Sequence, residues 1–338
     1  MIYSNQEIES FIKDSLGVCE AVTITPLKAT GNMTARLEDG GEVTLLNVLA
    51  GEKEYALKIK STAFENNVGD AMNYYASKDF EESFLKGKYV FYIRNNYNRE
   101  SKVYSALSQV KEYLPKVYGA QNDSYRSLIL LEKLDISREP KDIELADFLK
   151  KLHSLYIDEK EVEKLGANVH TKEDYTRATA LSLKLLDSIE RVYPDFPKEI
   201  LTLASNVINN YAKVFDKMIS YPRCLCHGDC TINNMTTTPS LKLYDLELST
   251  YNNAEFDLVS YLVHYPTLLN KDVIVKFLSR YYDDDNFMAN KKEVLSLNLL
   301  IYFVTRFHAM MMIAKKLDMP YMETSIKNYI YLFRFFNL

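Results

Sequence analysis

The chain has 338 residues, of which 47% are hydrophobic and 26% charged, a composition typical of a globular protein with room for two domains or lobes. Its formal net charge is -5, and both signs are spread along the sequence. A mildly acidic protein has no general electrostatic attraction for nucleic acid or for an anionic membrane, so we expect neither as a partner.

The N-terminal segment predicts a short amphipathic helix. Four apolar residues recur on one helical face, at Ile8, Phe11, Ile12 and Leu16. The segment lacks the basic start, the apolar stretch and the small-residue cleavage site of a secretory signal. We therefore expect a cytoplasmic protein whose cysteines are reduced.

The first half of the chain has the signals of a β-rich unit. Residues 43–49 and 54–60 predict two strands joined by the turn Ala-Gly-Glu-Lys. The elements predicted after them are a surface helix or insertion over residues 61–96, a helix over 99–110, and strands over 114–118 and 127–131.

The second half is mainly helical. Helices are predicted over residues 143–155, 175–192 and 198–219, over 299–314 as a buried helix interrupted by Arg306 and His308, and over most of the chain after residue 256. A strand-loop-strand block over residues 223–248 interrupts them. We therefore predict an α+β fold with an N-lobe at residues 1–131, a hinge at 132–134 and a C-lobe at 135–338.

Three cysteines surround a histidine in the pattern C-x-C-H-x-x-C, formed by Cys224, Cys226, His227 and Cys230. The alternatives are a zinc site and buried free thiols. Because the spacing lacks a second ligand pair, and because buried free cysteines are common small hydrophobic residues, we favour the thiols.

The same block carries the polar residues with the clearest chemistry. Asn234 follows Asp229 by five residues, and Asp245 lies eleven residues further on, beyond a predicted hairpin that brings the two ends together. Phosphoryl transfer to a hydroxyl needs an aligned acceptor, a carboxylate to accept its proton, and magnesium held by oxygen ligands. The pattern H-x-D-x-x-x-x-N followed by a second Asp supplies this set.

The segments HGDCTINN and YDLELSTYNNAEFDL resemble the aminoglycoside phosphotransferase and choline kinase superfamily, which has the protein-kinase-like fold. The resemblance implies two lobes, with ATP and Mg²⁺ as cofactors. By it, Asp229 is the catalytic base, Asn234 and Asp245 hold magnesium, and His227 supports the loop.

The residues after Asp245 are most similar to the choline and ethanolamine kinase branch, at Glu247, Ser249, Tyr251-Asn252 and Phe256-Asp257. This similarity implies a second metal contact at Glu247 and a structural anchor at Asp257. Two residues depart from it. Gly228 stands where choline kinases have Asn and aminoglycoside kinases have Gly, and Leu246 replaces an aromatic residue.

A kinase also needs a strand lysine for the nucleotide phosphates and a helix glutamate to orient it. Lys58 in YALKI fits the strand lysine, and Lys60, on the same face, is its rival. Glu100, at the start of the predicted helix RESKVYSAL, is the expected partner.

The remaining nucleotide contacts are predicted as backbone positions. Gly40 and Gly41, just before the strand that pairs with the lysine strand, are the predicted phosphate loop, and the loop at Gly31 is the alternative. Backbone groups from Glu132 to Leu134, in the predicted hinge, are expected next to adenine.

We therefore predict an ATP-dependent kinase that phosphorylates a hydroxyl of a small, cationic molecule, with a choline- or ethanolamine-like amino alcohol first. An aminoglycoside phosphotransferase-like antibiotic or sugar kinase is the alternative, and a catalytically inactive kinase-like binding protein is the alternative of another class. Late aromatic residues are candidates for a cation-binding box, although the chain has no tryptophan, at Tyr302, Phe303, Phe307, Tyr321, Tyr329 and Phe333.

Overall fold

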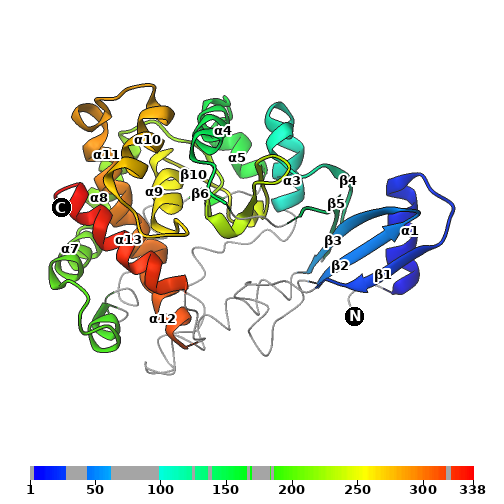
Figure 1. Ribbon diagram of the computed structural model, residues 1–338, viewed down its shortest axis with the longest axis horizontal. Helices are drawn as coiled ribbons and strands as arrows, with labels where there is room; N and C mark the ends of the chain where they lie inside the picture. The colour runs from blue at the N-terminus through cyan, green and yellow to red at the C-terminus, as the bar shows by residue number, and fades with distance from the viewer. Residues whose placement is uncertain are drawn as a thin grey trace.

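The computed structural model describes residues 4–27, 44–61, 99–123, 126–135, 139–165, 168–169, 183, 186–316 and 321–338. Within them, an antiparallel sheet lies at one end of the molecule and a helical body at the other (Figure 1). The predicted α+β fold class is therefore confirmed. The residues at which the lobes were divided, 131 and 134, stay a prediction.

The sheet has five strands in the order β1-β2-β3-β5-β4, namely β1 (Val22–Pro26), β2 (Thr44–Ala50), β3 (Lys53–Ser61), β5 (Arg126–Glu132) and β4 (Val117–Asn122). The hairpin of β2 and β3 and the strand β5 lie where the sequence predicted strands. β1 was not predicted, and β4 begins three residues later than expected, because Leu114 is buried in the preceding turn.

Helix α1 (Asn5–Leu16) covers one face of this sheet. It begins at a capping box made by Ser4 and Glu7 and ends at Gly17, which adopts the left-handed conformation that favours glycine. Its buried side chains pack with those of β2, β3 and β5 in one cluster, made of Ile8, Phe11, Ile12, Val48, Tyr55, Leu57, Ile59, Leu128 and Leu130. Because side chains alternate along a strand, β3 turns Lys58 and Lys60 to the opposite face.

The helix predicted over residues 99–110 is divided. Helix α3 (Arg99–Ala106) is followed by the 3₁₀ segment η4 (Ser108–Tyr113), within which Val110 leaves the helical conformation. Val103, Tyr104 and Val110 are buried in the main core, so α3 is held by the helical body while its N-terminal turn reaches β3.

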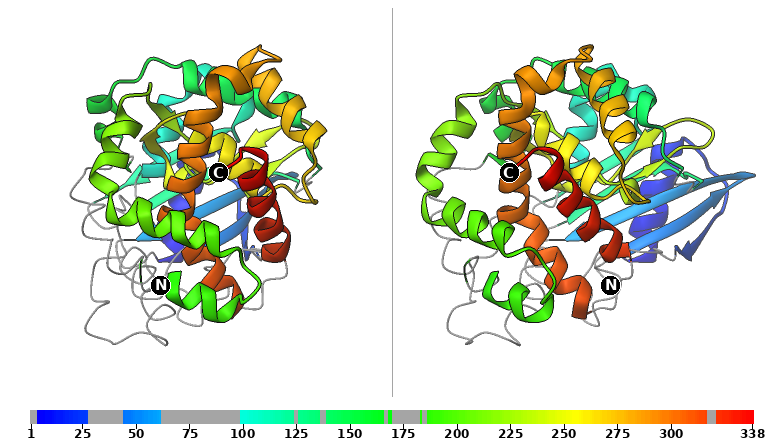
Figure 2. Two further views of the ribbon diagram at one scale, coloured as in Figure 1. Left: turned by 90° about the vertical axis from the view of Figure 1, so that its left-hand side faces the viewer. Right: turned by 60° about the vertical axis from the view of Figure 1, so that its left-hand side comes forward.

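The helical body contains α4 (Asp142–Ser154), α5 (Glu159–Lys164), α7 (Lys198–Asn209), α8 (Tyr211–Ile219), α9 (Glu255–Val263), α10 (Lys271–Tyr282), α11 (Phe287–Tyr302), α12 (His308–Lys316) and α13 (Tyr321–Phe335). Figure 2 looks toward this end, where α11 packs beside α7 and α9. The helix predicted over 198–219 is two helices, because the chain leaves the helical conformation at Asn210.

The buried segment predicted over residues 299–314 is not one regular helix. A π-helical turn, η7 (Phe303–Phe307), joins α11 to α12. Arg306 and His308, the two residues that interrupt the apolar run, are both buried. Among the described residues, no helix is both long enough and apolar enough to cross a membrane.

Short strands place the central loops. A three-stranded sheet joins β6 (Asn168–Val169), β10 (Thr250–Asn252) and β7 (Cys224–Cys226), and a hairpin pairs β8 (Met235–Thr236) with β9 (Lys242–Leu243). The predicted strand-loop-strand block is therefore present. The helix predicted over 175–192 is described only at residues 183 and 186–192, which are helical. The insertion predicted over 61–96 lies outside the described residues apart from residue 61.

Candidate active site

Two lysines of β3 meet a glutamate of α3 where the sheet joins the helical body. The Nζ atoms of Lys58 and Lys60 lie 2.8 and 3.0 Å from Oε2 of Glu100. The Glu100 side chain is only 1% exposed, so this carboxylate is buried between two cations. The structure thus places Lys58 beside its predicted partner Glu100, and Lys60, the alternative lysine, contacts the same carboxylate.

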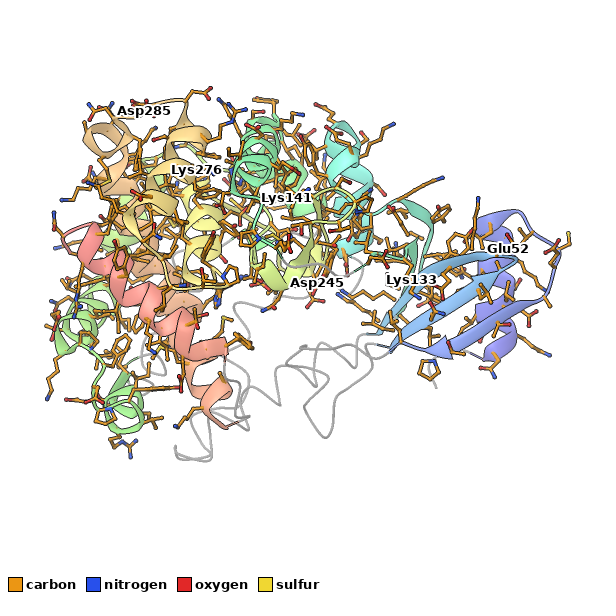
Figure 3. The ribbon with its side chains drawn as sticks, viewed as in Figure 1. Glu52, Lys133, Lys141, Asp245, Lys276 and Asp285 are labelled. Atoms are coloured by element: carbon orange, nitrogen blue, oxygen red, sulfur yellow. The ribbon has the colours of Figure 1, made fainter. Side chains whose placement is uncertain are left out.

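The same two lysines contact the acidic residues that follow β9. Lys58 Nζ lies 2.5 Å from Oδ1 of Asp245, and Lys60 Nζ is ion-paired with Oε2 of Glu247. Arg99 Nη1 donates a hydrogen bond of 2.6 Å to the backbone oxygen of Glu247, which fixes η6 (Leu246–Leu248) against α3. Figure 3 shows Asp245 at the border of the helical body, facing the sheet.

The charges in this cluster shift one another's proton affinities. Burial raises the pKa of Glu247, but the Lys60 and Lys58 cations outweigh it and lower that pKa to about 2. Burial and the neighbouring Glu247 carboxylate raise the pKa of Asp245 to about 6. Burial lowers the pKa of Lys58, but the adjacent carboxylates raise it well above its usual value, so Lys58 stays available as a cation.

Among the described residues, one group of three carboxylates has its oxygens close enough together to bind a metal ion. It consists of Glu100, Asp245 and Glu247. One oxygen from each lies within 4.8 Å of the others. An all-oxygen donor set of carboxylates is what Mg²⁺ prefers. Asp245 and Glu247 therefore offer the oxygens that the predicted metal site needs, and both, like Glu100, also contact the lysines of β3.

Asp229 and Asn234 lie together on the loop between β7 and β8. The Asn234 amide donates to Oδ2 of Asp229 at 2.7 Å and to its backbone oxygen at 3.0 Å. The backbone of Asn234 also accepts a hydrogen bond of 3.0 Å from the Tyr244 N–H, next to Asp245. The hairpin therefore brings Asn234 beside Asp245 in the backbone, while its side chain holds the carboxylate of Asp229.

The loop before Asp229 is anchored by a buried carboxylate. The backbone N–H groups of His227 and Gly228 donate to the two oxygens of Asp257, at 2.7 and 2.9 Å. The His227 ring lies between Tyr244 and Asp229, with Nε2 2.9 Å from the Tyr244 oxygen and Nδ1 accepting from the Asp229 N–H at 3.2 Å. His227 and Asp257 thus lie where loop support was predicted.

Gly228 is required by the backbone. Its φ of +79° is in the left-handed region, and a Cβ there would lie 2.0 Å from the carbonyl oxygen of Leu248. A side chain would push η6 away from the loop. The glycine that distinguishes this chain from choline kinases is therefore explained by packing, without reference to any acceptor.

A histidine that sequence reasoning did not select completes this anchor. His153, on α4, places Nε2 3.1 Å from the Asp257 carboxylate and Nδ1 2.9 Å from the Tyr281 hydroxyl. Burial lowers the pKa of His153, but the nearby Cys224 sulfur and Asp257 outweigh it and raise that pKa. Helical periodicity marked this segment only as a helix, so nothing in its spacing identified the residue.

Arg306 is the second residue that sequence reasoning missed. Its side chain is 8% exposed and its Nη1 lies 3.7 Å from Oδ1 of Asp229. Its guanidinium carbon lies 5.5 Å from the centroid of the Phe256 ring. The available signal was a charged residue inside an apolar run, which had been interpreted only as an interruption of a buried helix.

The predicted hinge makes side-chain contacts of its own. The Glu132 carboxylate accepts from Lys242 Nζ and from the Lys116 N–H, each at 3.0 Å, and the Glu132 N–H donates to the Lys116 oxygen at 2.8 Å. Leu134 is partly buried. The predicted phosphate loop at Gly40 and Gly41 and its alternative at Gly31 lie outside the described residues.

The cysteine-rich motif is buried. The sulfur atoms of Cys224 and Cys226 lie 3.9 Å apart, and His153 is near enough to be grouped with them. Both ring nitrogens of His153, however, already make hydrogen bonds, as do those of His227. The hydrogen bond with Cys226 lowers the pKa of Cys224, whereas burial raises the pKa of Cys226 and of Cys230, which disfavours the thiolate form that binds metal at those two residues.

Most of the late aromatic residues belong to the core. Phe307 stacks on Tyr329 and on Tyr302, and Phe303 packs against the same group. These four rings are fully buried, whereas Tyr321 is 36% exposed. The described members of the proposed box therefore pack against one another instead of lining an open pocket.

Residues 94–289 match the model of the phosphotransferase enzyme family. Similar folds include the choline kinase LicA of Streptococcus pneumoniae, with a TM-score of 0.56 and 14% identity over 96% of this chain and 99% of that one. No curated protein matches this chain in sequence.

Two further solved structures contain nucleotides. LicA in complex with AMP has a TM-score of 0.50 and 13% identity, over 97% of this chain and 99% of that one. A spectinomycin phosphotransferase in complex with ADP and spectinomycin has a TM-score of 0.51 and 12% identity, over 98% and 95%. At these identities the likeness concerns the fold, and it confirms the predicted protein-kinase-like architecture.

Proposed function

The chain belongs to the phosphotransferase enzyme family, since the match covers more than half of its length, and from this we propose that it transfers a phosphoryl group from ATP to a hydroxyl of a small molecule. The observation that carries the proposal is the contact of Lys58 with both Glu100 and Asp245, at 2.8 and 2.5 Å. A strand lysine, a helix glutamate and a metal-binding aspartate are the parts that kinase-like folds use for nucleotide phosphates.

In this proposal the nucleotide lies along β3 and the hinge. Lys58 binds the α and β phosphates, Glu100 orients it, and Lys60 adds a second cation beside Glu247. Backbone groups of Glu132 to Leu134 face adenine, and Gly40-Gly41 remains the proposed phosphate loop. The nucleotides in the structures of LicA and of the spectinomycin phosphotransferase support ATP as the donor.

Magnesium is the proposed metal, held by Asp245 and Glu247 with the amide oxygen of Asn234. When bound, it would bridge the phosphates and neutralise the charge that develops on them. The donor set fits this ion because it consists of oxygens alone. Lys58 and Lys60, which contact the two carboxylates, would then turn their ammonium groups to the phosphates.

Asp229 is the proposed base. Asn234 holds one of its oxygens, Oδ2, and the other, Oδ1, is left for the acceptor hydroxyl. The Asp229 side chain is 25% exposed, so an acceptor can reach it. Asp257 and His227 fix the backbone around it, which keeps the carboxylate aligned with the hydroxyl while the proton is transferred.

The acceptor is the open part of the proposal. The residues from Asp245 to Asp257 favour a choline- or ethanolamine-like amino alcohol, and an aminoglycoside or sugar is the alternative. Gly228 does not separate the two, because packing alone requires it. We place the reaction in the cytoplasm, with no nucleic acid or membrane as partner.

An ATP-consumption screen over choline, ethanolamine, aminoglycosides and sugar-like alcohols tests the function. We expect Mg²⁺-dependent turnover with at least one acceptor in the wild type and its loss in Asp229→Ala. Turnover that Asp229→Ala retains would overturn the role of Asp229 as the base. No turnover with any acceptor while nucleotide still binds would favour the catalytically inactive binding protein.

A further inference from the structure

We propose that Arg306 selects an acceptor that carries an anionic group, such as a carboxylate, next to the hydroxyl that is phosphorylated. This inference rests on the proposed function and narrows its acceptor class. It departs from the amino alcohol that the residues after Asp245 suggest.

The first observation is the position of the guanidinium. Arg306 lies in the π-helical turn η7, and such turns recur at functional sites because they re-aim side chains within a helix. Its Nη1 lies 3.7 Å from Oδ1 of Asp229, the oxygen left for the acceptor hydroxyl. A group bonded to that hydroxyl would therefore lie within reach of Arg306.

The second observation is the missing partner. Across the described parts of the chain, the buried Nη1 of Arg306 has no hydrogen-bond partner. Its distance from Asp229 is too long for a hydrogen bond. A buried cation of this kind needs hydrogen-bonded compensation, and a planar carboxylate matches the fork of a guanidinium.

Other neighbours do not supply a second negative charge. His264 is hydrogen-bonded to Tyr302 and Ser325. Asp229 and Arg306 both influence its pKa, and burial lowers that pKa to about 4. Burial and Asp229 raise the pKa of Tyr302, so its hydroxyl stays neutral. Among the described residues, only Asp229 makes an ionic contact with the guanidinium.

The third observation concerns cationic acceptors. An aromatic face near the base is where a ligand cation would bind, but the guanidinium of Arg306 already lies over the Phe256 ring. The rings of Phe303, Phe307 and Tyr329 are buried against one another. A fixed cation beside the hydroxyl would also be repelled by Arg306 at short range.

The test compares acceptors that differ in charge but share a scaffold. Glucuronate, glucose and glucosamine form one series, and glycolate, ethylene glycol and ethanolamine form another. Each compound is tested for binding by calorimetry in the presence of Mg²⁺ and ADP, and for phosphorylation with ATP. The proteins are the wild type, Arg306→Gln, Arg306→Lys, and Arg280→Gln as a matched control.

Arg280 is a suitable control because its ion pair with Asp147 lies on the surface and does not involve Asp229. We expect the wild type to bind and phosphorylate the acid of a series better than its amine. Arg306→Gln should weaken binding of the acid and raise its KM about 10- to 100-fold, with the KM for ATP unchanged. Arg306→Lys should recover part of the loss, and Arg280→Gln should change neither value.

Three results would overturn the proposal: a preference for the amine in both series, an acid affinity that Arg306→Gln leaves unchanged, or no measurable binding of any acid. If Arg306→Gln lowers kcat with every acceptor and leaves the acceptor KM unchanged, Arg306 acts on the phosphoryl group instead. That result would also overturn the proposal. Failure of the proposed kinase function can be distinguished from failure of the acceptor proposal, because binding of the acids is measured without turnover.

Discussion

The proposed nucleotide side and the proposed acceptor side of the candidate site hold their charges in different ways. On the nucleotide side, Lys58 and Lys60 contact three carboxylates at short range, and every one of these side chains is joined to another element of the fold. On the acceptor side, Asp229 meets Arg306 only at 3.7 Å. The first cluster is built into the structure, whereas the second leaves donor and acceptor atoms for a ligand.

Residues that link the sheet to the helical body serve two purposes. The ion pairs on the proposed nucleotide side connect β3, α3 and η6, so they hold the sheet to the helical body as well as forming the proposed phosphate and metal site. The acceptor-side residues connect less, so their removal should affect chemistry more than folding. Substitutions of Glu100 and of Asp229 test that contrast, and substitutions of Gly228 and His153 test the anchor of the Asp229 loop.

The largest expected effect on stability is that of Glu100→Gln. The substitution leaves Lys58 and Lys60 buried with one anionic partner fewer, and breaking a buried ion pair from one side costs about 3–5 kcal/mol. Urea unfolding of the variant should show this loss. Glu112→Gln, which removes an exposed pair with Lys151, should change stability by less than about 1 kcal/mol, and equal effects of the two would contradict the account.

Gly228→Ala comes next. Its Cβ would meet the Leu248 oxygen at 2.0 Å on a backbone with positive φ, and overpacking of this kind costs about 1–3 kcal/mol. Gly17→Ala is the matched control, because it has a similar φ of +65° with no atom within 4 Å of the new Cβ. Thermal unfolding should show a larger loss at Gly228. An equal loss at both would mean that the loop has room for a side chain.

The smallest effect is the pH dependence of His153. Its folded-state pKa is raised, so it stabilises the protein fully below its ordinary pKa of about 6.5, and this stabilisation is lost as pH rises through the raised value. The stability difference between wild type and His153→Gln should therefore be larger, by about 1 kcal/mol, at pH 6 than at pH 9.

His264→Gln provides the control of opposite sign. Burial lowers the pKa of His264 to about 4, so its contribution is present above about pH 6.5 and is lost as pH falls toward 4. The two variants should thus give pH profiles of stability with opposite slopes. Parallel slopes would show that the charge of His153 does not support the Asp257 anchor.

The sequence predicted the parts of this site that depend on local spacing. Lys58 and Lys60 share a face because side chains alternate along a strand. The short hairpin from Asn234 to Asp245 brings its two ends close together. The main strands and the fold class followed from the same kind of pattern. In each case the positions that matter lie within a few residues of one another or match a family motif.

The parts that were missed depend on tertiary contacts. His153 and Arg306 each lie on a helix whose periodicity showed only that it is partly buried, and no spacing links them to Asp257 or Asp229. The π-helical turn that aims Arg306 has no recognised sequence signal here. The division of the predicted helix at Asn210 was likewise missed, because the apolar periodicity continues through it.

The most direct test of the two-sided site is a comparison of nucleotide binding with phosphoryl transfer in wild type and Asp229→Asn. A single-turnover experiment, with an acceptor found in the screen, measures the rate of phosphoryl transfer from bound ATP. We expect Asp229→Asn to bind Mg²⁺·ATP with the affinity of the wild type and to transfer its phosphoryl group about 10²- to 10⁴-fold more slowly. Transfer at the wild-type rate in Asp229→Asn would contradict the account.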